Sequence, residues 1–336
     1  MRLTGWPAAG VKGGHLTGPG VARLILRTIA ASSTLTGICF ALAAGMIYSL
    51  NDMSIKFLSS GYPLHQIVAT RSVIALVIVL LSMRLITGGW HHLRTSRFRF
   101  HALRVGVVFI SNITYFLGLA ALPLADAVAT AYIGPVFITL LSIFFLGEKV
   151  GPHRWAAVVA GLIGTLVMVR PGAGTLQVAA LLVVFSAFTY AVSQMMVRQM
   201  RGTESTFTMG FYMQAGFLLS SLTTGALIGH GQFNVFEDGS LTFLFRPWVW
   251  PTPSDLPFFI VMGLAIGAAS LMMAQAYRTL EAAVAAPFEY IAIPMAVFWG
   301  LTVFGTLPDL TSFAGMALII GSGLYTIWRE TVKKKS

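Results

Sequence analysis

Long apolar stretches alternate with short polar connections along the whole 336-residue chain. A helix needs about 20 apolar residues to cross the hydrocarbon core of a bilayer, and ten stretches reach or approach that length. Their apolarity is continuous rather than alternating, which argues against a membrane β-barrel. The pattern therefore predicts an all-α polytopic membrane protein with spans near residues 35–58, 63–83, 103–122, 127–146, 154–170, 177–197, 206–229, 256–279, 282–304 and 311–328.

The two halves of this pattern repeat each other. The stretch from Tyr48 to Lys56 in the first span parallels the stretch from Tyr190 to Arg198 in the sixth. Residues 124–135 in the fourth span likewise parallel residues 280–294 in the ninth, with a two-residue insertion. The repeat unit is therefore five helices, and because five is odd, the second copy runs through the membrane in the opposite sense. Inverted repeats of this kind build secondary transporters, whose substrate site lies near the midplane between the repeats.

The predicted domain organisation of the chain follows from this repeat. It consists of a basic tail at 1–33, two five-helix repeats at 34–172 and 173–330, and a second basic tail at 331–336. The first tail holds four basic residues and no acid, so we expect it to be mobile and cytoplasmic.

Composition and charge agree with a membrane protein. Hydrophobic residues make up 56% of the chain and charged residues only 10%, whereas soluble domains are about a quarter charged. The net charge of +11 does not indicate nucleic-acid binding, because the basic residues fall in short loops between apolar stretches. With the N-terminus inside, 18 of the 22 Lys and Arg residues lie on the inner side. This bias predicts a bacterial inner-membrane protein with both termini in the cytoplasm.

Three charged residues lie well inside predicted spans, where a charge costs roughly 2.5–3.5 kcal/mol on insertion scales. Asp52 and Arg71 lie at similar depths in two adjacent antiparallel spans, which predicts an ion pair, with Lys56 as a competing partner of Asp52. One interpretation is that this pair only fixes the packing of the two helices. The other is that Arg71 faces a cavity and holds a carboxylate or phosphate of the substrate.

Glu289 is the third such residue. It lies about 10 Å from the inner end of its span, and the sequence places no basic residue within a span at that depth. Burial would favour the neutral carboxyl, which suits a proton acceptor in coupled transport. The alternative is a neutral carboxyl that is hydrogen-bonded within the helix bundle.

Polar and aromatic residues at similar depths form a candidate cavity lining, although each taken singly is more typical of a helix–helix contact. They are Asn51, Asn112, Tyr115, Tyr132, Tyr190, Gln194, Tyr212, Gln214, Gln275, Tyr290 and Trp299. Pro135 and Pro294 should break or kink the fourth and ninth spans and free backbone carbonyls toward that cavity. The small residues Ala156, Ala160 and Gly164, and Ala317 and Gly321, predict close helix packing.

Several of these motifs resemble the EamA family of the drug/metabolite transporter superfamily. The resemblance covers about residues 35–330 and rests on Ala125 to Ala129, Pro135, Phe145 to Glu148, Ala286 to Tyr290, and Leu307 to Asp309. It implies ten helices in inverted repeats, no cofactor and a small organic substrate.

The chain departs from the family pattern at two positions, so the family's coupling residues are not transferred. Gly134 stands where members often have Glu, and Thr306 replaces the Glu that usually follows Phe-Gly. Members with similar Phe-Glu-Tyr and Leu-Pro-Asp stretches include riboflavin and S-adenosylmethionine permeases, and other branches export amino acids. The substrate, the direction of transport and the coupling ion therefore stay open, as does the oligomeric state, with a homodimer among the options.

The rival class is a membrane-embedded enzyme that acts on a lipid-linked substrate. Such an enzyme would need a nucleophile with a base, a metal cluster or paired carboxylates. The sequence has no His-x-x-x-His, Gly-x-Ser-x-Gly or Asp-rich motif, and it has a single cysteine, Cys39. A P-loop is also absent, which argues against ATP-driven transport by this chain alone. We therefore expect a permease without metal or catalytic residues, whose partners are a small molecule and the lipid bilayer.

Overall fold

The computed structural model describes residues 19–146, 151–170, 172, 175–200, 203–236, 239–279 and 288–333. Within these residues the chain is helical and contains no β-strand. The helices are α1 (Pro19–Leu58), α2 (Leu64–Thr87), α3 (Phe98–Ala121), α4 (Leu124–Ala131), α5 (Gly134–Leu146), α6 (Pro152–Val169), α7 (Thr175–Met200), α8 (Thr206–Ile228), α9 (Gly239–Phe245), α10 (Leu256–Thr279), α12 (Ala292–Phe304) and α13 (Leu310–Lys333). A 3₁₀ turn, η1 (His91–Leu93), lies between α2 and α3.

Seven of these helices are long and apolar enough to cross a membrane. They coincide with the predicted first to fourth and sixth to eighth spans, the fourth being formed by α4 and α5 together. Shorter apolar helices lie at the fifth, ninth and tenth positions, at Trp155–Val169, Ala292–Phe304 and Leu310–Thr326. Residues 280–287, which hold much of the predicted ninth span, lie outside the described residues.

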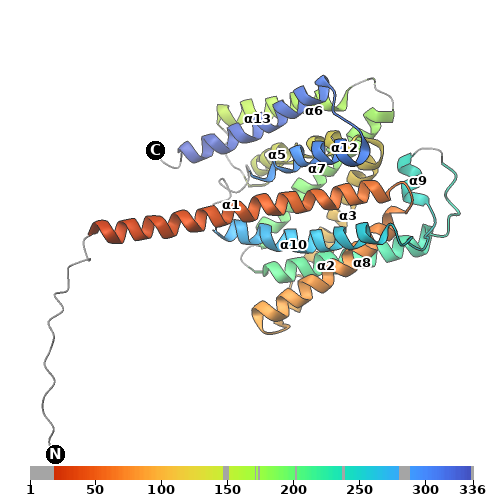
Figure 1. Cartoon of the computed structure of the whole chain (residues 1–336), viewed down its shortest axis with the longest axis horizontal. Coiled ribbons are helices and arrows are strands. Elements are labelled where there is room, and N and C mark those ends of the chain that lie inside the picture. Colours follow the sequence, from red (N-terminus) through yellow and green to blue (C-terminus); the bar gives the residue numbers. More distant parts are fainter. Residues whose placement is uncertain are drawn as a thin grey trace, which may run out of the picture.

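The first helix is longer than its predicted span. It begins at Pro19, so its first turns lie within the stretch that the sequence assigned to a tail. Residues 1–18 and 334–336, which hold the rest of the two predicted tails, lie outside the described residues. Figure 1 shows the N-terminal part of α1 extending beyond the helix bundle.

The helices pack as a layered bundle. The pair α6 and α13 forms one outer layer and the pair α2 and α8 the opposite one, with the remaining long helices between them (Figure 1). Extensive contacts join α1 to α10 and α3 to α7. The two helices α4 and α12 meet in the middle of the bundle, so the residues beside their ends are brought together across the chain.

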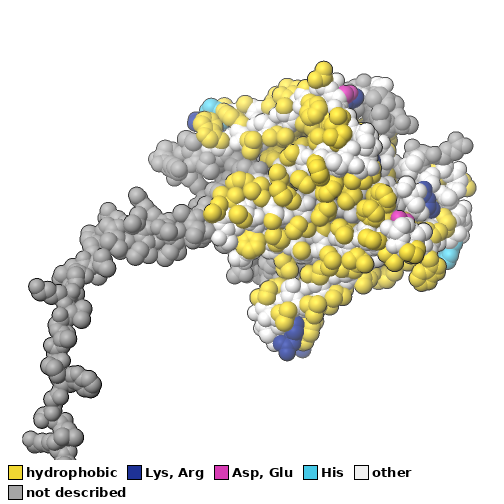
Figure 2. All heavy atoms as spheres, viewed as in Figure 1, with side chains coloured by type: hydrophobic (Ala, Val, Ile, Leu, Met, Phe, Trp, Pro, Cys, Tyr) yellow, Lys and Arg dark blue, Asp and Glu magenta, His cyan; other side chains and the backbone are white. Residues whose placement is uncertain are grey.

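The surface is that of a protein surrounded by lipid. Large side chains such as Leu85, Leu219 and Leu310 are mostly exposed. Figure 2 shows hydrophobic side chains covering most of one face of the bundle, with charged side chains near its edges. Every backbone N–H and C=O at this depth must be paired within the protein, and helices alone satisfy this within each segment.

Candidate functional site

Two interrupted helices meet in the middle of the bundle. The first interruption is at Tyr132 and Ile133, between α4 and α5, and the second is at Tyr290 and Ile291, directly before α12. The Tyr132 hydroxyl donates to the backbone carbonyl of Glu289 over 2.7 Å, and the rings of Tyr132 and Tyr290 lie 5.1 Å apart. The two non-helical turns therefore contact each other directly.

The predicted breaking residues Pro135 and Pro294 lie just after these turns. Each proline is in the first turn of the helix that follows, where its missing N–H removes no helical hydrogen bond. The interruptions are thus displaced from the prolines by a few residues toward the N-terminus.

A cavity of about 140 Å³ lies beside the interruptions. Tyr132, Glu289 and Tyr290 form one side of it, and α5, α6 and α13 supply the rest of its lining, namely Pro135, Val136, Thr139, Ala157, Val158, Ser322, Gly323 and Thr326. The Tyr290 hydroxyl lies so close to Gly323 that a Cβ there would be 1.6 Å from the phenol oxygen. Only glycine at position 323 leaves room for this ring.

Tyrosines from four elements of the bundle lie near Glu289. Tyr48 of α1 and Tyr190 of α7 join Tyr132 and Tyr290, and all four phenols interact electrostatically with the Glu289 carboxylate. Tyr190 is 47% exposed. It hydrogen-bonds to Gln194 and interacts electrostatically with Arg104 of α3.

Asp52 lies in a separate polar network between α1 and α3. Its carboxylate accepts hydrogen bonds from the Asn51 amide and the Tyr115 hydroxyl, and each bond is 2.9 Å long. The predicted direct pair with Arg71 is replaced by a bridge, because Arg71 donates to Asn51 Oδ1 at 3.4 Å. Asn51 therefore connects the acid to the base.

Arg71 is enclosed within the protein. It is 3% exposed and also donates to Asn112 Oδ1 at 3.3 Å. Its guanidinium lies over the rings of Phe116 and Phe217, 5.5 and 5.8 Å from their centres. Two amides and two aromatic faces thus solvate this charge from three helices.

Lys56, expected to compete for Asp52, has other partners. Its ammonium group donates to the carbonyls of Leu119 and Leu122 at 2.8 and 2.5 Å. These carbonyls lie at the C-terminal end of α3, where a helix leaves its last acceptors unpaired and favours a cation. Lys56 is therefore a helix cap.

The remaining candidate residues are dispersed. Trp299 of α12 donates to Ser49 of α1 over 3.0 Å and joins these two helices. Gln275 is half-buried on α10. Tyr212 and Gln214 lie on α8, and the Tyr212 hydroxyl donates to the carbonyl of Leu93 at one end of the bundle.

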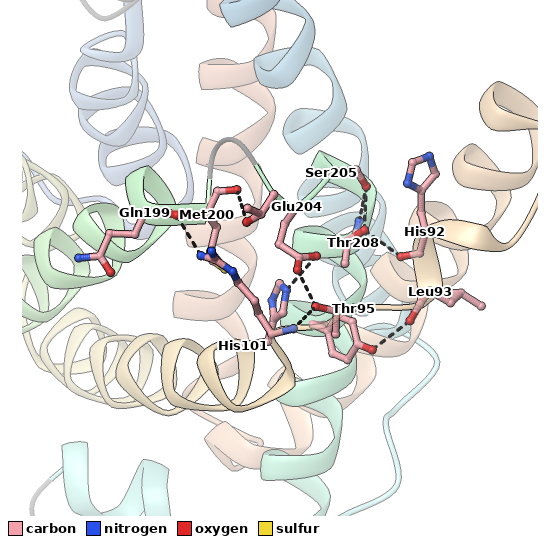
Figure 3. Close-up of polar contacts among 12 residues, drawn as sticks. His92, Leu93, Thr95, His101, Gln199, Met200, Glu204, Ser205 and Thr208 are labelled. Atoms are coloured by element: carbon pink, nitrogen blue, oxygen red, sulfur yellow. Dashed lines mark hydrogen bonds and ion pairs between the residues drawn. The ribbon is translucent and has the colours of Figure 1, made fainter.

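That end carries a dense polar cluster (Figure 3). Glu204, just before α8, accepts a hydrogen bond from the Thr95 hydroxyl at 2.7 Å and lies 3.4 Å from His101 Nε2. The side chains of Glu204 and His101 are at most 4% exposed. Thr208 donates to the carbonyl of His92 at 2.9 Å. The cluster ties the α7–α8 turn to the segment between α2 and α3.

A comparable cluster closes the opposite end. Tyr62, just before α2, donates to Asp255 Oδ2 at 2.7 Å and accepts from the backbone N–H of Thr252. Gln66 exchanges two hydrogen bonds with the backbone of Val249, one of them 2.6 Å long. This cluster ties the α1–α2 turn to the segment between α8 and α10.

The α6–α13 pair has its own charged contact. Arg170 donates to Asp309 Oδ1 at 2.5 Å and to the Ser312 hydroxyl at 2.7 Å. The same carboxylate oxygen accepts the backbone N–H of Ser312 and so caps α13. This N–H and the Arg170 guanidinium hold the pKa of Asp309 below its usual range. Asp126 of α4 also hydrogen-bonds to Ser312.

Comparison with known proteins assigns this architecture. Residues 35–170 match the EamA-like transporter family. This part of the chain is therefore similar to EamA-like transporters. A solved crystal structure has the same fold, with a TM-score of 0.60 and 22% sequence identity. The match covers 88% of this chain and 96% of the solved one.

Relatives of this EamA-like chain are named as transporters. It is 28% identical to a riboflavin transporter of Vibrio cholerae over 90% of this chain and 96% of the relative. It is 29% identical to a riboflavin transporter of Rhizobium johnstonii, over 70% and 72% of the two chains. It is 24% identical to an S-adenosylmethionine uptake transporter of Rickettsia prowazekii, over 88% and 94%. The relatives are thus all named as transporters, and their names differ in substrate.

Sequence reasoning missed the two end clusters and Arg104. Glu204, Tyr62 and Asp255 lie in loops or at helix ends, where single polar residues carry no distinctive spacing. Their partners are distant along the chain, so only the folded structure reveals them. In the described residues, no group of three or more His, Cys, Asp or Glu side chains could hold a metal ion.

Proposed function

We propose that this protein is a secondary active transporter that carries a small polar or amphiphilic metabolite across the inner membrane by alternating access. The observation that carries this proposal is the contact between two interrupted helices beside a cavity inside the bundle. Interrupted helices expose unpaired backbone groups at membrane depth, which is tolerated where those groups line a site. Relatives that are named as riboflavin and S-adenosylmethionine transporters support the same function.

The proposal includes ten spans arranged as two inverted five-helix repeats. The helix packing supports this arrangement, since exchanging equivalent spans maps one set of contacts onto another. The α1–α10 contact becomes the α3–α7 contact, and the α2–α10 contact becomes the α3–α8 contact. The pairs α2–α8 and α6–α13 map onto themselves.

The two end clusters supply the gates of the proposed cycle. Tyr48 and Tyr190 are separated by the same number of residues as Tyr62 and Glu204. In each repeat, a residue just before the second helix bonds to a side chain just before the third helix of the other repeat. Tyr62 bonds to Asp255 in this way, and Glu204 bonds to Thr95. Both clusters are intact in the structure, so opening one while the other stays closed would expose the centre to one side.

The proposed orientation places Figure 3's cluster in the cytoplasm and the Tyr62 cluster in the periplasm. Reporter fusions at residues 90 and 335 should both be active only in the cytoplasm, and a fusion at residue 240 only in the periplasm. A cytoplasmic signal at residue 240 would contradict the inverted arrangement.

Glu289 is the proposed proton carrier. A titratable carboxyl within the membrane is expected to have a function. Glu289 lines the cavity beside the helix interruptions, among hydroxyl groups that can hydrogen-bond to either protonation state. Glu289→Gln should therefore exchange substrate at saturating concentration but fail to concentrate it under an imposed pH gradient. Undiminished proton-driven accumulation by this variant would remove Glu289 from coupling.

Flux measurements in proteoliposomes that contain only this protein test the function itself. Labelled riboflavin and labelled S-adenosylmethionine are the substrates to offer, because relatives are named for them. We expect saturable uptake of at least one of them that empty liposomes lack. Uptake of neither, together with chemical conversion of a lipid-linked substrate, would favour the membrane-enzyme alternative.

A further inference from the structure

Arg104 is a second arginine that lies among the helices. It is about 9 Å along the axis of α3 from Phe98, within a helix long and apolar enough to cross a membrane. Among the described residues, its Nε atom is buried without a hydrogen-bond partner, and its electrostatic partner is the phenol of Tyr190 rather than a carboxylate. Arg71, by contrast, is bound by two amides and two rings. A charge within a membrane span is costly to insert, so an arginine with so few partners indicates a role in function.

The position of Arg104 on α3 directs it into the bundle. Ser111 and Tyr115 follow it at helical spacing on the same face of the helix. Ser111 donates to the carbonyl of Ser186 on α7 over 2.8 Å, and Tyr115 donates to a carboxylate on α1. Arg104 therefore lies on the face of α3 that packs against other helices.

The outer face of α3 is a different one. Leu103 and Ile110, seven residues apart on that face, are 60% and 48% exposed, as expected for side chains that contact lipid. Arg104 is only partly exposed. Its place beside α7 favours a solute over a lipid phosphate as its ligand.

Two polar side chains of α7 face the same region as Arg104. Ser186, Tyr190 and Gln194 follow one another at four-residue spacing, and α3 and α7 are in extensive contact. Tyr190 hydrogen-bonds to Gln194 and interacts electrostatically with Arg104. A Cβ at Gly134, the first residue of α5, would lie 4.0 Å from the Tyr190 ring. The three polar side chains thus connect the helix interruption to the part of the bundle nearer the end cluster of Figure 3.

These side chains have the chemistry of an oxyanion site. A guanidinium presents a planar fork of N–H donors that matches a carboxylate or a phosphate, and a phenol and an amide can each donate as well. Tyr190 is 47% exposed and Arg104 is partly exposed, so both are accessible to a ligand.

We propose that Arg104, Tyr190 and Gln194 bind the carboxylate or phosphate of the substrate as it passes between the helix interruptions and the end cluster of Figure 3. This inference rests on the proposed transport function and narrows its substrate class to molecules that carry an oxyanion. Arg104 is then the residue that selects for this group.

Binding of matched pairs to the purified full-length protein tests this inference. Riboflavin 5′-phosphate and riboflavin differ by a phosphate, and S-adenosylmethionine and its decarboxylated form differ by a carboxylate. We expect the wild type to bind at least one oxyanion about tenfold more tightly than its counterpart. Arg104→Gln should abolish that preference, and Tyr190→Phe, which keeps the ring, should weaken it. Arg84→Gln is the matched control, since it removes an exposed arginine at the same end of the bundle and should keep the preference.

Four results would overturn the inference. They are equal binding of each oxyanion and its counterpart, a preference that survives Arg104→Gln, no measurable binding of either oxyanion, and a preference that added phosphatidylglycerol removes. The last result would assign the site to a lipid phosphate. Uptake of riboflavin by proteoliposomes of the same preparation would then leave the transporter proposal standing. Absence of uptake of every substrate offered would instead count against the transport function.

Discussion

At the scale of single residues, Arg71 illustrates how a membrane-embedded charge is stabilised without a direct counter-ion. The sequence predicted that Arg71 and Asp52 lie at similar depths, which the structure agrees with, but not that Asn51 lies between them. Side-chain direction decides this detail, and spacing along a helix does not specify which of two adjacent residues points to the neighbouring helix. The planar guanidinium is suited to the site because it reaches Asn51 and Asn112 at once.

Arg71→Lys should therefore insert and fold but lose stability. The ammonium group keeps the charge but cannot donate to both amides while lying flat between Phe116 and Phe217. Loss of a buried charged hydrogen bond costs about 1–3 kcal/mol, which thermal unfolding in detergent would detect. Arg84→Lys on the same helix is the control, because Arg84 is exposed and bonds only to the carbonyl of Gly88. Equal stability of Arg71→Lys and wild type would show that a point charge suffices.

The environment of Asp309 predicts a specific pH dependence of the protein's stability. Its pKa is lower in the folded protein than in the unfolded chain, because the Ser312 N–H and Arg170 stabilise the carboxylate. Its stabilising contribution is then complete above the unfolded value of about 3.9 and is lost as the pH falls through the lower folded value. The difference in melting temperature between wild type and Asp309→Asn should be constant from pH 7 to 5 and shrink below pH 4. A difference that is unchanged at pH 3 would contradict this assignment.

At the scale of helices, the apolar pattern predicted most of the elements, because each span must satisfy its backbone internally and therefore forms a helix. The apolar pattern was less successful at predicting which faces of the helices pack against each other. The row Ala317 and Gly321 was predicted to pack closely, yet both residues are exposed, and the contact of α13 with α6 instead involves Gly315 and Ile319. Small residues on a lipid-facing surface and at an interface have the same composition, so sequence alone does not separate them.

Gly164→Val should disrupt the α6–α13 contact. A Cβ at Gly164 would lie 2.9 Å from Leu318 Cβ and 3.1 Å from the carbonyl oxygen of Gly315, so a branched side chain forces the helices apart. Overpacking of this kind costs about 1–3 kcal/mol and should lower the melting temperature. Gly321→Val is the matched control on α13, because nothing lies within 4 Å of its added Cβ. Equal effects of the two substitutions would contradict the packing described.

At the scale of the whole molecule, the sequence repeat predicted which motifs are equivalent but not how they contact each other. Tyr132 and Tyr290 meet across the bundle, and Glu204 and Thr95 join turns that are far apart in the chain. Such contacts depend on the final packing of many helices, which local periodicity does not encode. The two end clusters give the proposed alternating access its physical parts, since each one connects a helical hairpin to a segment of the other half.

Locking each end separately is the most direct test of this account. Cys39, the single cysteine, is first replaced by Ser, and cysteine pairs are then introduced at Thr95 and Glu204 or at Tyr62 and Asp255. A short reducible bis-thiol cross-linker joins each pair in proteoliposomes, and substrate uptake is measured before cross-linking, after it, and after reduction. We expect either cross-link to abolish uptake and reduction to restore it. Continued uptake with either end cross-linked would contradict the alternating opening of the two clusters.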